Sequence, residues 1–291
     1  MKLKYFILPF IFILLLIPLS AFEWPVDEVV MKNTFGEKSG RDFNTGITLG
    51  GPRQAVHSAD FGEIVFYYNE DEEFLPSGLG NFIVVEHPRS LYSIYSHLES
   101  GYFGSPGGYE LTPEDTLGWV GNTGDATGLQ LNLEIVDLEF DQMVNPLNLL
   151  PPKSDKSAPV VDGVWIFEDE WKVLEDGQSL LPGERELFVS VWDQSVELPY
   201  FRPMAPYKLN VFTNGEEIFY QAFEAVEAKE GVLYLVSKQD YRSFSNLYND
   251  EGYIRIGSYT FNPGETILEV VASDYRGNKE FYNISIKVSA Q

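Results

Sequence analysis

Residues 118–135 read GWVGNTGDATGLQLNLEI, and they hold the clearest strand pattern in the chain. In the second half, apolar residues at positions 129, 131, 133 and 135 alternate with Gln130, Asn132 and Glu134. Alternation with a period of two predicts a strand with one face in a core and one polar face. The first half has the Gly, Asn and Thr content of a tight loop. Such a strand can form the floor of a groove, so its polar face is where function is expected.

The composition of the whole chain favours β structure. Of 291 residues, 44% are hydrophobic and 15% are aromatic, which allows one large domain or two moderate ones, each with a buried core. Short runs rich in Val, Ile, Tyr and Phe recur along the chain. Cysteine is absent, which excludes disulfides, thiolate metal sites and a thiol nucleophile.

In the first half of the chain, β-rich runs are separated by glycine, proline or acidic turns. They predict an antiparallel sheet that is rolled up or stacked on a second sheet. The predicted strands before the one quoted above span residues 62–68, 81–87, 91–98 and 117–120.

The second half begins after a polar stretch bounded by prolines, residues 153–159, which predicts a linker. Asn214-Gly215 between two apolar runs is a strong hairpin signal. Strands at turn-punctuated intervals predict a β-sandwich over residues 160–291. Residues 238–256 are less regular and are interpreted as an insertion at one end of the sandwich. The predicted strands span residues 160–167, 187–192, 207–213, 217–222, 266–273 and 282–288.

Several motifs together resemble one family. The glycine loop, its strand and NPLNLLP at residues 145–151 resemble the last core strand of the lysostaphin-like (LytM-type) zinc endopeptidases that cut peptidoglycan cross-bridges. RDFNTGIT at residues 41–48 resembles the opening motif Arg-x-Phe-His-x-Gly-x-Asp, and YSHL at residues 95–98 resembles the central Tyr-x-His-Leu. The resemblance implies an antiparallel lysostaphin-like core in residues 22–152.

A second resemblance concerns the sandwich. TILEVVASDYRGNK at residues 266–279 resembles the final strand pair of bacterial immunoglobulin-like modules. The expected fold is therefore all-β: a lysostaphin-like peptidase core followed by an immunoglobulin-like β-sandwich.

The family's metal ligands are replaced in this chain. The resemblance assigns its three zinc ligands to the positions of Asn44, Thr48 and Asn132, where the family has histidine, aspartate and histidine. Zinc in catalytic sites is held by imidazole, thiolate or carboxylate groups plus water. Amide and hydroxyl groups bind zinc poorly, so we expect no zinc and no other cofactor.

The resemblance assigns two further catalytic histidines to the positions of His97 and Gln130. His97 is retained, but a glutamine cannot transfer a proton near neutral pH. The expected binding groove comprises five residues, none of which is expected to be catalytic. They are Asn44, Thr48, His97, Gln130 and Asn132.

The N-terminal residues and the net charge of the chain indicate its expected cellular location and partners. Residues 1–21 combine two lysines, an apolar run and a small-residue cleavage site, which predicts a signal peptide; an uncleaved anchor is the alternative. With no second spanning run, the expected protein is exported, periplasmic or at the cell surface, without a membrane span after cleavage. The net charge of −24 argues against a nucleic-acid partner. The oligomeric state is not predicted.

The favoured function is therefore a catalytically inactive, zinc-free domain that binds peptidoglycan or a cell-wall hydrolase in the cell envelope. A residually active peptidoglycan metalloendopeptidase and a purely structural envelope spacer are the two alternatives.

Overall fold

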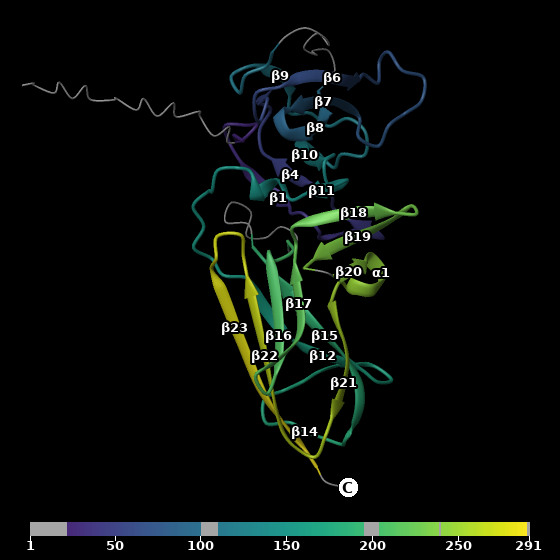
Figure 1. Ribbon diagram of the computed structural model, residues 1–291, viewed down its shortest axis with the longest axis vertical. Coiled ribbons are helices and arrows are strands. Elements are labelled where there is room, and N and C mark those ends of the chain that lie inside the picture. The colour runs from purple at the N-terminus through teal and green to yellow at the C-terminus, as the bar shows by residue number, and fades with distance from the viewer. Residues whose placement is uncertain (1–21, 100–109, 195–203, 239, 290–291) are drawn as a thin grey trace, which may run out of the picture.

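The computed structural model describes residues 22–99, 110–194, 204–238 and 240–289, and almost every described element is an antiparallel strand (Figure 1). The predicted all-β class is thus confirmed. The only α-helix within these ranges is the single turn α1 (Phe244–Leu247), and two 3₁₀ turns, η1 (Pro88–Ser90) and η2 (Pro146–Asn148), complete the helical content. The predicted signal peptide, residues 1–21, lies outside the described residues. No helix within the described ranges is long and apolar enough to cross a bilayer.

The N-terminal half is built on one large sheet. It has the order β20-β19-β18-β11-β10-β8-β7-β6, and β4 pairs with both β10 and β1. The first three strands of this order come from the C-terminal part of the chain: β20 (Asp240–Ser243), β19 (Val232–Ser237) and β18 (Ala225–Lys229). The four strands predicted before the glycine loop are present as β6, β7, β8 and β9. The strands of this half are β1 (Val30–Asn33), β2 (Lys38–Ser39), β3 (Asp42–Phe43), β4 (Ile47–Gly50), β5 (Ala55–His57), β6 (Glu63–Tyr68), β7 (Asn81–His87), β8 (Leu91–Leu98), β9 (Thr116–Trp119), β10 (Gln130–Asp137) and β11 (Gln142–Val144).

The C-terminal half is a sandwich of two sheets, with the orders β13-β12-β15-β21 and β14-β23-β22-β16-β17. The predicted hairpin at Asn214-Gly215 joins β16 to β17, and both turn residues have positive φ, as the tight two-residue turn requires. The strands are β12 (Val160–Phe167), β13 (Trp171–Val173), β14 (Ser179–Leu180), β15 (Gly183–Trp192), β16 (Lys208–Thr213), β17 (Glu216–Ala222), β21 (Ile254–Phe261), β22 (Gly264–Ser273) and β23 (Lys279–Val288).

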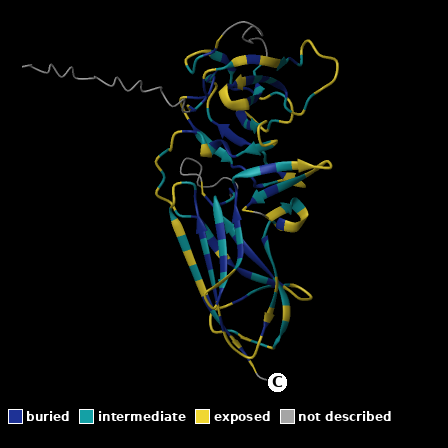
Figure 2. Ribbon diagram, viewed as in Figure 1, coloured by how far each residue is buried: buried dark blue, intermediate teal, exposed yellow. Residues whose placement is uncertain are grey.

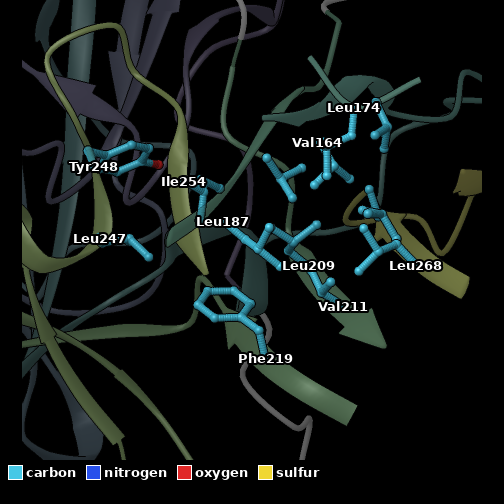
Figure 3. Packing of buried hydrophobic residues seen from close by; sticks show 14 of the residues in the cluster. Val164, Leu174, Leu187, Leu209, Val211, Phe219, Leu247, Tyr248, Ile254 and Leu268 are labelled. Atoms are coloured by element: carbon cyan, nitrogen blue, oxygen red, sulfur yellow. The ribbon is translucent and has the colours of Figure 1, made fainter. Parts of the chain in front are cut away.

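The protein has two hydrophobic cores, one for each half. One lies under β4, β7, β8 and β10 and contains the fully buried Tyr95, Leu131 and Leu133. The other fills the sandwich, where Val164 and Leu187 from one sheet meet Leu209 and Leu268 from the other (Figure 3). Buried positions alternate along the sandwich strands with exposed ones, as the period of two predicts (Figure 2).

The two halves are also joined by a sheet that the sequence did not predict. β18 (Ala225–Lys229), β19 (Val232–Ser237) and β20 (Asp240–Ser243) extend the N-terminal sheet, because β18 pairs with β11 through Met143 opposite Val226. The tight turn between β18 and β19 lies at Glu230-Gly231, both with positive φ. The strands of residues 225–243 therefore belong to the N-terminal sheet, whereas the sequence placed residues 225–237 within the range of the sandwich and residues 238–243 in an insertion at its end.

Candidate functional site

Thr48, Asn132 and Ser96 form a row across three neighbouring strands. Asn132 on β10 lies directly opposite Thr48 on β4 and, on its other side, opposite Ser96 on β8. Directly opposed residues of antiparallel strands project from the same face. Thr48 Oγ1 donates a hydrogen bond to Asn132 Oδ1 at 3.2 Å, and the two residues are 7% and 8% exposed. The structure thus brings together two of the positions that the sequence assigned to metal ligands.

The polar face of β10 is the one predicted. Leu131 and Leu133 are fully buried in the core, and Asn132 and Glu134 alternate with them on the other face. The prediction is wrong for Leu129, which is 45% exposed. The chain is still in the loop there, since Gly128 has a φ of 102° and the strand starts at Gln130.

Asn44, the first predicted ligand position, is hydrogen-bonded to the backbone around it. Its Nδ2 donates to the carbonyl oxygens of Thr34 at 2.8 Å and Gly46 at 2.9 Å. Both amide hydrogens are therefore used to hold the turn that leads from β1 to β4. Asn44 has a structural role in this arrangement, and the Thr48–Asn132 hydrogen bond does not involve it.

Gln130 is paired with a cation. Its Oε1 accepts a hydrogen bond from Nζ of Lys32, which lies on β1, at 2.6 Å. Lys32 reaches β10 by crossing Gly50, where a Cβ atom would lie only 2.7 Å from Lys32 Cδ. Glycine at position 50 therefore leaves the space that the lysine stem occupies. The glutamine at the position where the family resemblance implies a catalytic histidine is therefore bonded to an ammonium group.

His97, the residue before the last of β8, has a left-handed conformation with φ of 65°. Its Nδ1 lies 2.9 Å from the carbonyl oxygen of Thr123 in the glycine loop. A carbonyl can only accept, so Nδ1 carries the hydrogen and Nε2 is the acceptor in the neutral ring. Burial lowers the pKa of His97, with the Thr123 hydrogen bond and the negative charges of Asp125 and Glu134 acting in the opposite direction. The ring is therefore neutral at pH 7.

Two contributors to this face were missed by sequence reasoning, Lys32 and Ser96. Lys32 lies ahead of the first motif, where nothing in the sequence pairs it with Gln130. Glu134 was placed on the polar face by the sequence, and its Oε1 accepts a hydrogen bond from Thr45 Oγ1 at 2.6 Å. Ser96 is fully buried, and its Oγ has no hydrogen-bond partner among the described residues. Its position inside YSHL, opposite Asn132, is the signal that could have identified it.

Another histidine of the N-terminal half, His87, has a structural role. His87 is buried and lies 2.8 Å from the carbonyl oxygen of Phe61 through Nδ1 and 2.6 Å from Ser93 Oγ through Nε2. Burial lowers its pKa. Both ring nitrogens are occupied inside the protein, so His87 is not available to a site on the β10 face.

The chemistry of the face is that of hydrogen bonding. Asn44, Thr48 and Asn132 offer neutral amide and hydroxyl groups, whereas zinc in proteins takes imidazole, thiolate or carboxylate ligands. This donor set does not fit a zinc ion. The side chains present can instead donate and accept hydrogen bonds, with one ammonium group at Lys32 and one carboxylate at Glu134.

Sequence comparisons agree with the motifs. The family model of peptidase family M23 matches residues 42–146, and a second family model, which carries no description, matches residues 158–289. The murein hydrolase activator NlpD of Salmonella dublin is 30% identical over 137 residues, which are 47% of this chain and 33% of that protein. The chain thus spans about a third of the length of that curated relative.

The comparison with solved structures found two peptidases with a limited likeness to this chain. The catalytic domain of the prophage-encoded M23 protein EnpA from Enterococcus faecalis is 21% identical, with 38% of this chain and 83% of that chain covered and a TM-score of 0.34. Lysostaphin from Staphylococcus simulans is 11% identical, with 79% and 88% covered and a TM-score of 0.35. The family assignment rests on the sequence match and its ordered motifs: residues 42–146 are a peptidase family M23 domain.

Proposed function

We propose that this M23 domain is non-catalytic and acts in the cell envelope by binding a cell-wall hydrolase or peptidoglycan. The observation that carries the proposal is the Thr48–Asn132 hydrogen bond. Thr48 and Asn132, which stand at two of the three ligand positions, are neutral and form a hydrogen bond with each other. The residue at the third position, Asn44, donates hydrogen bonds to backbone carbonyls. Zinc is then not retained, and hydrolysis by a metal-activated water is not available.

The sequence relative supports the choice of partner. NlpD is named as a murein hydrolase activator, and the proposal gives this chain a role of the same kind. The β10 face suits binding, because its amide, hydroxyl, ammonium and carboxylate groups can pair with a peptide backbone or a partner's loop. Export through the signal peptide at residues 1–21 belongs to the same proposal, as does the immunoglobulin-like character of the sandwich.

The first test is metal content. The purified chain should contain far less than one zinc ion per molecule by mass spectrometry, and it should release no fragments from purified peptidoglycan. Stoichiometric zinc, or zinc-dependent release of fragments by the chain alone, would overturn the non-catalytic assignment.

The second test is activation. Dye-labelled peptidoglycan is incubated with a cell-wall amidase with and without the chain, and we expect the chain to increase dye release. Lys32→Gln should weaken this effect, whereas the same substitution at the exposed Lys279 should not. If the chain neither changes amidase activity nor sediments with peptidoglycan, the binding role is wrong and the spacer alternative is favoured.

A further inference from the structure

A contiguous set of apolar side chains runs from β6, the last strand in the order of the N-terminal sheet, into the loop that follows it. The ring centroids of Phe66 on β6 and Phe82 on β7 are 5.6 Å apart, and the ring of Tyr68 stacks on that of Phe82 at 5.5 Å. The Tyr68 hydroxyl donates a hydrogen bond to the backbone oxygen of Leu75, next to Phe74. We call Phe66, Tyr68, Phe74, Leu75 and Phe82 the apolar strip.

The apolar strip is open to solvent. Phe74 is 96% exposed, Leu75 is 72% exposed and Phe66 is 51% exposed. The loop between β6 and β7 projects from the N-terminal half, and most of its residues are exposed (Figure 2). Single exposed apolar residues are ordinary, whereas a contiguous set of them marks an interaction surface. Since Phe74 buries almost no area in the folded chain, packing within the chain does not explain its position.

Hydrogen bonds hold the first turn of this loop in place. The amides of Glu72 and Glu73 donate to the backbone oxygen of Asn69 at 3.0 and 3.1 Å. Asn69 Nδ2 donates to Glu72 Oε1 at 3.0 Å, and the amide of Glu70 donates to Asn81 Oδ1 at 2.8 Å. The loop therefore presents its exposed side chains from a folded base, which reduces the entropy that is lost when a partner binds.

The apolar strip continues onto the sheet face that carries the candidate site. Phe66 on β6 lies opposite Val84 on β7. Val84 lies opposite Ile94 on β8, which in turn lies opposite Glu134 on β10. Directly opposed residues of antiparallel strands project from the same face. The strip and the polar face of β10 are therefore two parts of one surface.

The charge beside the apolar strip is negative. Asp71, Glu72 and Glu73 directly precede Phe74 and are exposed, and none of the three forms an ion pair with another described residue. Residues 22–152 hold 21 acidic and 5 basic residues, a formal charge of −16. A surface of this charge repels anionic lipids and acidic polymers and attracts a cationic partner.

We propose that the apolar strip binds a partner protein, through a segment in which lysine or arginine residues accompany apolar side chains. The apolar side chains of that segment would cover Phe66, Phe74 and Leu75, and its cations would pair with the carboxylates of Glu72 and Glu73. This inference rests on the proposed binding function, and it selects a protein partner over peptidoglycan for this surface.

The first test measures the binding of short synthetic peptides to the purified full chain by calorimetry at physiological salt. A peptide of alternating leucine and lysine should bind, and NMR mapping should place it at Phe74 and Leu75. A lysine–serine peptide of the same charge and a leucine–glutamate peptide should each bind at least about tenfold more weakly, because one lacks apolar groups and the other has the wrong charge. Equal binding of the lysine–serine peptide, or NMR changes confined to other surfaces, would overturn the proposal.

A double variant locates the contact. Phe74→Ser with Leu75→Ser changes only exposed side chains, so the Tm should stay the same while the affinity for the leucine–lysine peptide falls about tenfold or more. Leu181→Ser, at a residue of the sandwich half that is 64% exposed, should bind like the parent chain. Undiminished affinity in the double variant contradicts the proposal. Self-association of the parent chain that the double variant abolishes would assign the strip to a second copy and would also contradict it.

The contribution of charge is measured separately. Glu72→Gln with Glu73→Gln should weaken peptide binding a few-fold and reduce its salt dependence. Asp169→Asn with Glu170→Gln removes the same charge from an exposed turn of the sandwich and should weaken binding less. Equal weakening by the two pairs would show attraction to net charge alone and would exclude a site at this loop.

The amidase assay separates this inference from the proposed function. The variant with Phe74→Ser and Leu75→Ser should increase dye release less than the parent chain does. Equal activation by both chains, or a loss of sedimentation with peptidoglycan in the variant, would overturn the inference and leave the proposed function standing. If the parent chain neither activates the amidase nor sediments with peptidoglycan while the peptide results hold, the proposed function fails and the apolar strip remains a site for a basic segment.

Discussion

The backbone amide of Asn44 donates a hydrogen bond to the backbone carbonyl of Glu37, 2.9 Å away. The residue at the first ligand position is thereby fixed to a turn that carries a buried carboxylate of its own. Glu37 is 7% exposed, accepts from the Thr34 amide at 2.9 Å and from the side chain of Asn33, and adds its charge to the surroundings of Tyr248 in the C-terminal half. The turn that fixes Asn44 therefore also carries Glu37, whose charge acts on Tyr248 in the C-terminal half.

Glu37 predicts a pH dependence of stability. Burial raises its pKa from 4.5 to about 7, against the hydrogen bonds from Thr34 and Asn33. Between these values the folded state holds a proton that the unfolded state has lost, so this stabilisation is complete below pH 4.5 and disappears as the pH rises to 7. The change is on the order of 3 kcal/mol. Urea unfolding from pH 4.5 to 8 should show it.

The matched variants are Glu37→Gln and Glu73→Gln. Glu37→Gln has no charge to bury and should flatten the decline in the free energy of unfolding, whereas Glu73→Gln, in an exposed loop, should keep it. An unchanged slope in Glu37→Gln would show that other groups cause the dependence.

Lys32 and Asp125 should move the pKa of His97 in opposite directions. The ammonium of Lys32 lowers that pKa and the carboxylate of Asp125 raises it. Removing the cation in Lys32→Met should therefore raise the pKa of His97, and removing the anion in Asp125→Asn should lower it. NMR titration of the His97 ring protons measures both. Shifts of the same sign in the two variants would contradict the arrangement of charges around the ring.

Metal binding should return when ligands are restored. In the fourfold variant Asn44→His, Thr48→Asp, Gln130→His and Asn132→His, we expect one zinc ion per chain by mass spectrometry. Turning residue 44 away from the Thr34 and Gly46 carbonyls breaks two hydrogen bonds, each worth about 1 kcal/mol. The double variant at positions 48 and 132 avoids that cost but supplies only two ligands, so it should bind zinc more weakly. A folded fourfold variant without zinc would show that the four positions do not converge.

Asn145 should matter for stability across the junction. It is 3% exposed, its Nδ2 donates to the carbonyl of Phe223 at 2.8 Å, and its Oδ1 accepts from the Leu147 amide at 3.0 Å. Asn145→Ala leaves buried backbone groups unpaired and should lower the free energy of unfolding by about 1–3 kcal/mol. Asn262→Ala, at an exposed turn, is the control and should change it by less than about 0.5 kcal/mol.

The strands and the polar face were predictable because they depend on local periodicity. Leu131 and Leu133 alternate with Asn132, and a period of two has one structural meaning in a short segment. The predicted burial of Leu129 was wrong because the alternation continues one residue into the loop. There the backbone direction is set by the conformation of Gly128 and not by the strand pattern.

What could not be predicted depends on contacts between distant segments. Lys32 and Gln130 are 98 positions apart, and only the β1–β4–β10 pairing brings them together. The pairing of β18 with β11 likewise joins distant segments, and Val226 and Leu235 of the added strands lie in the same core as Phe35. The hydrogen bonds of Asn44 could not be predicted, because the sequence does not show which backbone carbonyls lie near the asparagine side chain in the folded protein.

The β11–β18 pairing has a practical consequence for dissecting the protein. Cutting the chain at the linker would remove β18 from one side of β11, which would keep β10 on its other side, and would leave the N–H and C=O groups on the β18 side facing solvent. Exposed strand edges recruit other chains, so residues 22–152 expressed alone should self-associate, although every M23 motif is intact. A fragment that also supplies a β18-like peptide in trans should stay monomeric.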